Sequence, residues 1–197
     1  MDNEKKQFSA HDFPEIYKDL SIEVPKLGCV MLDVKEMPQD PYKEQMDERD
    51  IFYTSENKDR FWIDGYVAGK TPHITLLYGL LAPAYKQKAR IEEVLAGWRV
   101  KNVTVGKIGY FPSPYRDDPY FCIVGHIVVT PELLEGHQRL ELLPHVNTFP
   151  GYKAHITLAY VKADPEIRDF AITNFEAWLP GRDLPIAKDL NFGSDKK

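Results

Sequence analysis

Two copies of one short pattern, each combining an imidazole with a hydroxyl, are the groups in this sequence best suited to do chemistry. The segments HITLLY (73–78) and HITLAY (155–160) agree at five of six positions and begin 82 residues apart. Both are apolar stretches typical of strands, in which successive side chains point to opposite faces. The histidine, the threonine two residues later and the fifth residue (Leu77 or Ala159) should therefore share one face. The Ile, Leu and Tyr between them should share the other, apolar face.

The predicted catalytic residues are His73, Thr75, His155 and Thr157. Two imidazoles suit cleavage of a phosphodiester, because a neutral one takes a proton from the attacking oxygen and a protonated one gives a proton to the leaving oxygen. The threonine hydroxyls can donate to the non-bridging phosphate oxygens. Which histidine is the base and which the acid stays open at this point.

A metal site is the main competing interpretation of the paired histidines. Zinc requires a third protein ligand and often uses a helical pair such as H-E-x-x-H, and the sequence has no such spacing. We therefore expect neither a metal nor another cofactor. His126, in the apolar run FCIVGHIVV, is interpreted as a packing residue, and the polar surroundings of His11, His137 and His145 indicate surface groups.

Composition is that of a soluble globular chain. Of the 197 residues, 43% are hydrophobic and 28% charged, with a formal net charge of −5. This charge disfavours a protein that coats long nucleic acid, which needs a basic face, but not one that binds a small anion in a local site. Cys29 and Cys122 lie in apolar runs, which predicts buried thiols and no disulfide framework. Without a membrane span or the apolar core of a signal peptide, the chain is expected in the cytoplasm; its oligomeric state is open.

The elements that must position the motifs follow from apolar patterns and capping signals. Strands are predicted over 26–34, 72–81, 101–111, 119–130 and 154–161, and within 184–192. Helices are predicted over 83–98, 131–143 and 164–179, beginning near Pro83, Thr130 and Asp164. The first 25 residues are expected to form an irregular arm, and 35–71 a polar loop region with a short helix around 43–51. Because a helix follows each motif, two half-domains related by pseudo-symmetry are expected.

With these motifs the chain resembles the 2H phosphoesterase superfamily, whose hallmark is two His-x-Thr/Ser triplets, here at 73–75 and 155–157. The resemblance extends over about 26–192. It implies a bilobal α+β fold, in a single domain over 1–197, with two pseudo-symmetric lobes of antiparallel sheet around a central cleft. It also implies metal-independent hydrolysis or transfer at RNA-type phosphodiesters, including 2′,3′-cyclic phosphates and 2′–5′ bonds.

A narrower resemblance rests on GCVMLDV (28–34), DIFY (50–53) and PHITLLYGL (72–80). These segments look like parts of phage anti-CBASS cyclic-oligonucleotide phosphodiesterases. The resemblance implies a phosphoric diester hydrolase that linearises cyclic di- and trinucleotide messengers such as cGAMP, as immune evasion by a bacteriophage in the host cytoplasm. The near alternative is the same chemistry on RNA ends or 2′–5′ bonds. The alternative of another class is a nucleotide-binding module that sequesters its ligand.

Side chains around the motifs are candidates for binding the substrate. Aromatic side chains stack on bases for about 1–3 kcal/mol each, and a lysine can hold phosphate. The predicted substrate-binding residues are Tyr53, Trp62, Tyr110, Tyr115, Phe149, Tyr152 and Lys153. Phe111, Lys70 and Arg116 are further candidates of the same kinds, and each of these side chains has packing or solvent exposure as its alternative role.

Overall fold

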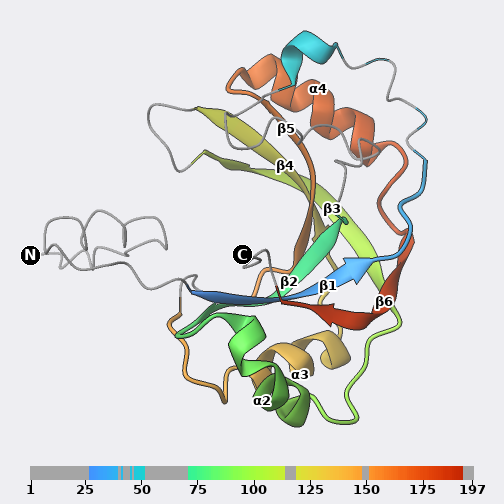
Figure 1. The fold of residues 1–197 in the computed structure, drawn as a ribbon. Coiled ribbons are helices and arrows are strands. Elements are labelled where there is room, and N and C mark those ends of the chain that lie inside the picture. Colours follow the sequence, from blue (N-terminus) through green and yellow to red (C-terminus); the bar gives the residue numbers. More distant parts are fainter. Residues whose placement is uncertain are drawn as a thin grey trace, which may run out of the picture.

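Six antiparallel strands and three α-helices make up the part of the chain that the computed structural model describes (Figure 1), namely residues 27–39, 41, 45, 47–51, 71–113, 119–147 and 151–192. The strands are β1 (Gly28–Val34), β2 (His73–Leu80), β3 (Asn102–Pro112), β4 (Tyr120–Ile127), β5 (His155–Lys162) and β6 (Asp183–Asn191). The helices are α2 (Lys88–Val94), α3 (Pro131–Leu140) and α4 (Pro165–Glu176), with short 3₁₀ helices η2 (Glu48–Asp50) and η3 (Ala84–Gln87). The predicted α+β class is confirmed.

The strands form a closed ring in the order β1-β2-β5-β4-β3-β6, which makes the two motif strands, β2 and β5, direct neighbours. Strand β6 closes the ring because it pairs with both β1 and β3. Figure 1 shows α4 at one end of the molecule and α2 and α3 together at the other. The two predicted antiparallel lobes are thus present, but their sheets join into one ring.

The order of elements repeats along the chain. The series β1-β2-α2-β3 is followed by β4-β5-α4-β6, with α3 inserted between β4 and β5. Exchanging β1 with β4, β2 with β5 and β3 with β6 leaves the ring order unchanged. A pseudo-twofold axis therefore passes between β2 and β5, as expected from two copies of the HIT pattern.

The helices begin where their capping signals predicted and end earlier. The Thr130 hydroxyl accepts a hydrogen bond from the Leu133 amide at 3.2 Å, and the Asp164 carboxylate accepts one from the Glu166 amide at 2.8 Å. Both side chains are therefore N-caps, but α3 and α4 end about three residues before the predicted positions. The helix predicted over 83–98 is a 3₁₀ helix followed by the short α2, and Gly97 in a left-handed conformation (φ +74°) follows its end.

The core anchors both motif strands. Ile74, Leu76, Ile156 and Leu158 are almost completely buried, at 0–1% exposure. Burying one such side chain contributes about 1.5–3 kcal/mol to the free energy of unfolding. Ile74 and Leu76 flank one motif threonine, and Ile156 and Leu158 flank the other, so the core holds the motif residues in place.

Several predictions fall outside the described residues, among them the arm over 1–25 and most of the loop region over 35–71. Of the short helix predicted around 43–51, residues 45 and 47–51 are described, and they include the 3₁₀ helix η2. That the chain is one domain over 1–197 stays a prediction. In the described parts, no helix has both the length and the apolar character needed to cross a bilayer.

Candidate active site

The register between β2 and β5 brings the two motifs together. Ile74 is paired with Ile156 in this antiparallel pair, which places the histidine of each motif opposite the threonine of the other. Directly opposed side chains lie on the same face of a sheet, with Cβ atoms about 4.5–5.5 Å apart. The four residues predicted from the sequence as catalytic therefore form one cluster with twofold pseudo-symmetry.

Each motif strand contains a β-bulge directly after its threonine. Between Val30 and Met31, β1 advances by one residue while β2 advances by two, which makes Leu76 the extra residue. Between Ile123 and Val124, β4 advances by one residue while β5 advances by two, which makes Leu158 the extra residue. The two bulges occupy equivalent positions in the two halves of the ring.

The bulges break the simple alternation that the sequence predicted. Leu77 and Ala159, predicted to lie beside the motif residues, are buried at 5% and 0%, and Tyr78, predicted on the apolar face, is 39% exposed. The prediction of faces is therefore correct as far as Leu76 and Leu158 and wrong from Leu77 and Ala159 onward, because alternation restarts after each extra residue. The histidine and threonine of each motif precede the bulge and keep their shared face.

The two motif imidazoles are anchored in the same way. Nδ1 of His73 lies 3.2 Å from the Thr71 carbonyl oxygen, and Nδ1 of His155 lies 2.9 Å from the Lys153 carbonyl oxygen. A carbonyl oxygen only accepts, so Nδ1 carries hydrogen in both rings and Nε2 is the nitrogen that takes or gives a proton. This anchoring suits both rings to acid–base chemistry, and it does not distinguish the acid from the base.

A thiol accompanies each motif threonine, a feature that the sequence reasoning missed. Sγ of Cys29 lies 4.0 Å from Oγ1 of Thr75, and Sγ of Cys122 lies 3.9 Å from Oγ1 of Thr157. Both cysteines are half-buried, and no disulfide joins them. The signal that points to them is the repeat itself, since β1 and β4 carry the similar runs CVM and CIV in equivalent strands.

The Cys29 thiol should react slowly in the folded protein. Burial raises its pKa to about 11, and the contact with Thr75 offsets only part of that effect. At pH 8 the thiolate is therefore rarer than in the unfolded chain by about 100-fold. We expect iodoacetamide at pH 8 to label Cys29 at least about 100-fold more slowly in the native chain than in urea, as followed by peptide mass spectrometry. Equal rates in the two states would contradict the burial of this thiol.

Two stacked rings support the bulge of β2. The Tyr152 hydroxyl donates to the Thr75 carbonyl at 3.2 Å, and Nδ1 of His137 lies 2.7 Å from the Leu76 carbonyl. The rings are nearly parallel, with centroids 4.1 Å apart. Burial raises the pKa of Tyr152, which keeps its hydroxyl a donor. His137 is thus not the surface group predicted, because its side chain is only 14% exposed, and substrate binding by Tyr152 stays a prediction.

Phe111 on β3, rather than its neighbour Tyr110, lies beside the second motif. The Phe111 ring meets the His155 ring edge to face, with centroids 5.0 Å apart. Tyr110 points to the opposite face of the strand, where the Arg168 guanidinium of α4 lies 4.7 Å from its ring centroid. The structure does not bring Tyr110 to the histidines, so its predicted contact with the substrate stays a prediction.

The remaining predicted substrate-binding residues are only partly described. Lys153 is exposed and lies two residues before His155, so it flanks the second motif as predicted. The others, Tyr53, Trp62, Tyr115 and Phe149, lie outside the described residues, as do Lys70 and Arg116.

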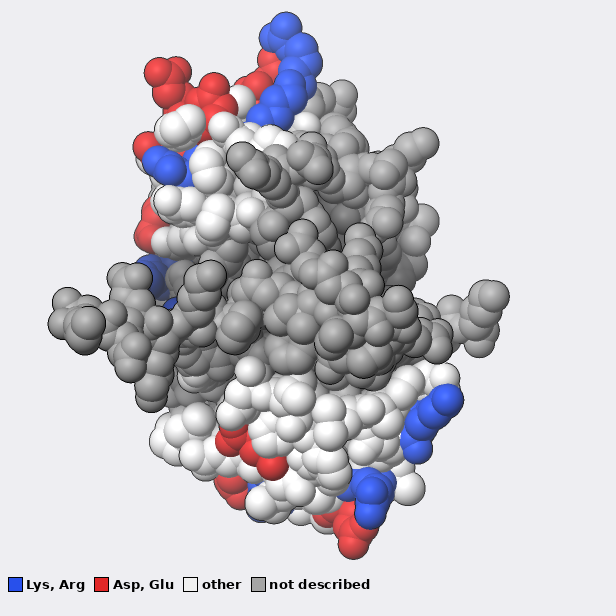
Figure 2. Space-filling model, turned by 90° about the vertical axis from the view of Figure 1, so that its left-hand side faces the viewer, with Lys and Arg blue, Asp and Glu red and all other residues white. Residues whose placement is uncertain are grey.

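Charge is mixed over the described surface. On the face drawn in Figure 2, acidic and basic side chains lie in small neighbouring groups, and the residues described there form no continuous basic stripe. Among the described residues, no three His, Cys, Asp or Glu side chains gather so as to hold a metal ion. The predictions about long nucleic acid and about a cofactor both stay predictions.

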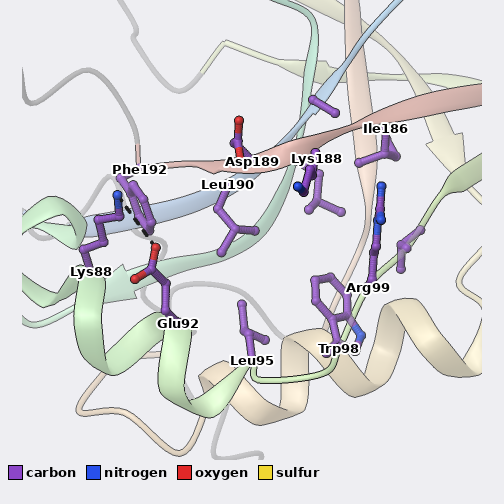
Figure 3. A pocket seen from close by; sticks show the side chains of 13 residues that line it. Lys88, Glu92, Leu95, Trp98, Arg99, Ile186, Lys188, Asp189, Leu190 and Phe192 are labelled. Carbon is purple, nitrogen blue, oxygen red and sulfur yellow. Dashed lines mark ion pairs between the residues drawn. The ribbon is translucent and has the colours of Figure 1, made fainter.

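A pocket of about 280 Å³ lies apart from the motifs, between α2 and β6 (Figure 3). Its walls include Trp98, Lys188 and the ion pair between Lys88 and Glu92, whose charged atoms are 3.7 Å apart. No motif residue lines this pocket. It is therefore a separate feature of the outer surface.

Comparison with known proteins defines the class to which this fold and site belong. The family model described as the 2′-5′ RNA ligase superfamily matches residues 38–186, well over half of the chain and both motifs. The chain belongs to this superfamily, that of the 2H phosphoesterases, as the sequence predicted. Membership indicates an enzyme of the phosphodiesterase or ligase type.

Two similar solved structures are of Usb1 from Kluyveromyces marxianus, one of them with uridine monophosphate. They share 13% and 12% identity with this chain, with TM-scores of 0.48 and 0.50, and each alignment covers 85% of this chain and 97% of the other. At 12% identity, the similarity between this chain and the Usb1 structure with uridine monophosphate shows a shared fold and nothing about ligand binding. Among curated protein sequences, none matches this chain. The narrower resemblance to phage enzymes has no support in these comparisons.

Proposed function

We propose that this protein cleaves RNA-type phosphodiester bonds by acid–base catalysis with its two motif histidines, without a metal ion. The observation that carries the proposal is the β2–β5 register, which places each motif histidine opposite the threonine of the other motif. Two anchored imidazoles and two hydroxyls then surround one position on the shared face. A nucleotide-binding module that only sequesters its ligand would have no use for a paired acid and base.

The proposed reaction is an in-line displacement at phosphorus. One imidazole removes the proton of a ribose 2′-hydroxyl through Nε2, and the 2′-oxygen forms a bond to the adjacent phosphorus. The bond from phosphorus to the 5′-oxygen breaks, and the other imidazole protonates that oxygen. The hydroxyls of Thr75 and Thr157 donate to the non-bridging oxygens, whose charge grows in the transition state. The products are a 2′,3′-cyclic phosphate and a 5′-hydroxyl.

Cyclic di- and trinucleotides are the proposed substrates, and cleavage of one 3′,5′ bond would linearise them. Support comes from the three sequence segments that resemble phage anti-CBASS phosphodiesterases. Immune evasion in the cytoplasm of an infected bacterium belongs to the same proposal. A second candidate is cleavage at RNA ends, which the fold shared with a Usb1 structure holding uridine monophosphate favours.

The test is a chromatographic assay of EDTA-treated protein. Its substrates are a cyclic dinucleotide, a cyclic trinucleotide, a 2′,3′-cyclic mononucleotide and a short oligoribonucleotide. The matched control is a 3′,5′-linked cyclic dinucleotide made of two 2′-deoxynucleotides, which has no 2′-hydroxyls. We expect the cyclic dinucleotide and the cyclic trinucleotide to be linearised and the control to remain intact. Cleavage of the oligoribonucleotide alone would favour the second candidate. Intact substrate in every mixture, or activity lost with EDTA and restored by zinc, would overturn the proposal.

A further inference from the structure

Each motif strand has a second neighbour besides the other motif strand, namely β1 for β2 and β4 for β5. The residue of this second neighbour that is paired with the motif histidine differs between the two halves. On β1, Asp33 is paired with His73, and on β4, His126 is paired with His155. The two positions are equivalent, because each lies four residues after the cysteine of its own strand. Pseudo-symmetry would place the same residue type at these two positions, but the chain has a carboxylate in one half and an imidazole in the other.

We propose that Asp33 and His126 are positioning residues that give the two motif histidines different roles. The carboxylate beside His73 favours the imidazolium form, so His73 is the acid that protonates the leaving oxygen. Within the part of the chain that the structure describes, no carboxylate is paired with His155, which is the neutral base that takes the proton of the attacking hydroxyl. This inference rests on the proposed function, in which both histidines transfer protons.

The His126 ring packs closely against β3. Directly opposed residues of antiparallel strands point to the same face, so His126 lies beside His155, and the Phe111 ring meets both imidazoles edge to face, with centroids 6.0 and 5.0 Å away. On β3, a side chain at Gly109 would begin only 2.7 Å from Nε2 of His126. The sequence interpretation of His126 as a packing residue therefore missed its place next to the second motif.

The surroundings of His126 disfavour a positive charge. Partial burial lowers its pKa, and the positive charges of Lys107 and Lys153 lower it further, as would a proton on the neighbouring His155 ring. His126 is therefore neutral at pH 7 and offers no countercharge to its neighbour. Among the described residues, the groups that face His155 are neutral or basic: His126 from β4, Phe111 from β3, Thr75 from β2, and Lys153 just before β5.

Unlike His155, His73 is faced by a carboxylate among the described residues. Asp33 faces it from β1 and Thr157 from β5. The amide nitrogen of Asn191, on β6, donates to one Asp33 carboxylate oxygen at 2.7 Å, which holds the carboxylate beside the motif strand. A carboxylate within about 4–6 Å of a cationic group shifts its titration upward by about one to three pH units.

The test exchanges the charges and follows each limb of the pH–rate profile of the full chain on a cyclic dinucleotide. Asp33→Asn keeps an acceptor oxygen for Asn191 and should move the alkaline limb down by about one pH unit or more, leaving the acid limb in place. His126→Asp should move the acid limb up, because the base then holds its proton to higher pH. Asp189→Asn, which removes an exposed carboxylate from the separate pocket, should move neither limb.

A proton NMR titration of the histidine rings keeps this inference distinguishable from the proposed function. With resonances assigned from His73→Ala and His155→Ala, the His73 ring should lose its proton at lower pH in Asp33→Asn than in the wild type. If no phosphodiester is cleaved but this shift is found, the proposed function fails alone. If cleavage occurs but Asp33→Asn moves neither the alkaline limb nor the His73 titration, the role of Asp33 is overturned.

Discussion

His73→Ala and His155→Ala should each lower the rate of phosphodiester cleavage by about 10²–10⁴-fold while the fold is retained. Each imidazole is half-buried and anchored by one carbonyl, so its removal leaves no large cavity. The variant loses a proton transfer that water performs poorly, because water lacks a pKa near neutrality. Binding of the substrate should change far less than its turnover, since the hydroxyls of Thr75 and Thr157 remain.

His145→Ala is the matched control for these variants. Nδ1 of His145 lies 2.9 Å from the Leu143 carbonyl, two residues earlier, the same local arrangement as in the motif histidines. Turnover by this variant should therefore match that of the wild type, and circular dichroism should show that all three variants are folded. Near-wild-type turnover in either motif variant would remove that histidine from the mechanism.

Thr75→Val and Thr157→Val should each lower turnover by about 10²–10³-fold, the loss typical of a donor to a developing oxyanion. Valine has nearly the volume of threonine, so the change removes the hydroxyl and leaves the packing beside Cys29 or Cys122. Thr→Ser at either position should restore most of the rate, because the serine hydroxyl occupies the same place on the strand.

The measurement for the threonine variants is kcat on a saturating substrate, with the free energy of urea unfolding as a second readout. Thr173→Val on α4 is the control, since its hydroxyl donates to the Asp169 carbonyl within the helix, at 2.8 Å. A rate loss in Thr75→Val no larger than in Thr173→Val would assign Thr75 to packing. Failure of Thr→Ser to recover the rate would point to the side-chain methyl group instead of the hydroxyl.

Much of the secondary structure follows from local sequence features such as helix caps and apolar runs. Thr130 and Asp164 cap the helices that follow them, and six apolar runs correspond to the six described strands. The two HIT triplets point to the four clustered residues, because a period of two puts a histidine and the next threonine on one face. These features depend on neighbours within a few residues, which is why the sequence predicts them.

The bulges at Leu76 and Leu158 carry no comparable local signal. Leu-Leu and Leu-Ala are compatible with regular alternation, and the extra residue arises only because β1 and β4 pair with β2 and β5 in a shifted register. The same holds for the carbonyls of the first bulge, which His137 and Tyr152 bind from distant parts of the chain. The exposure of Tyr78 and the burial of His137 therefore do not follow from the local sequence.

The sequence by itself determined the superfamily, the four side chains proposed to react and the pseudo-symmetry that relates them. Only the tertiary structure decided which residues stand beside those side chains. Asp33 and His126 are unremarkable in their own strands, and they acquire their roles because strand pairing sets one against His73 and the other against His155. The charge around an imidazole is set by neighbours in space rather than in sequence, so the difference between acid and base follows from the register of the strands.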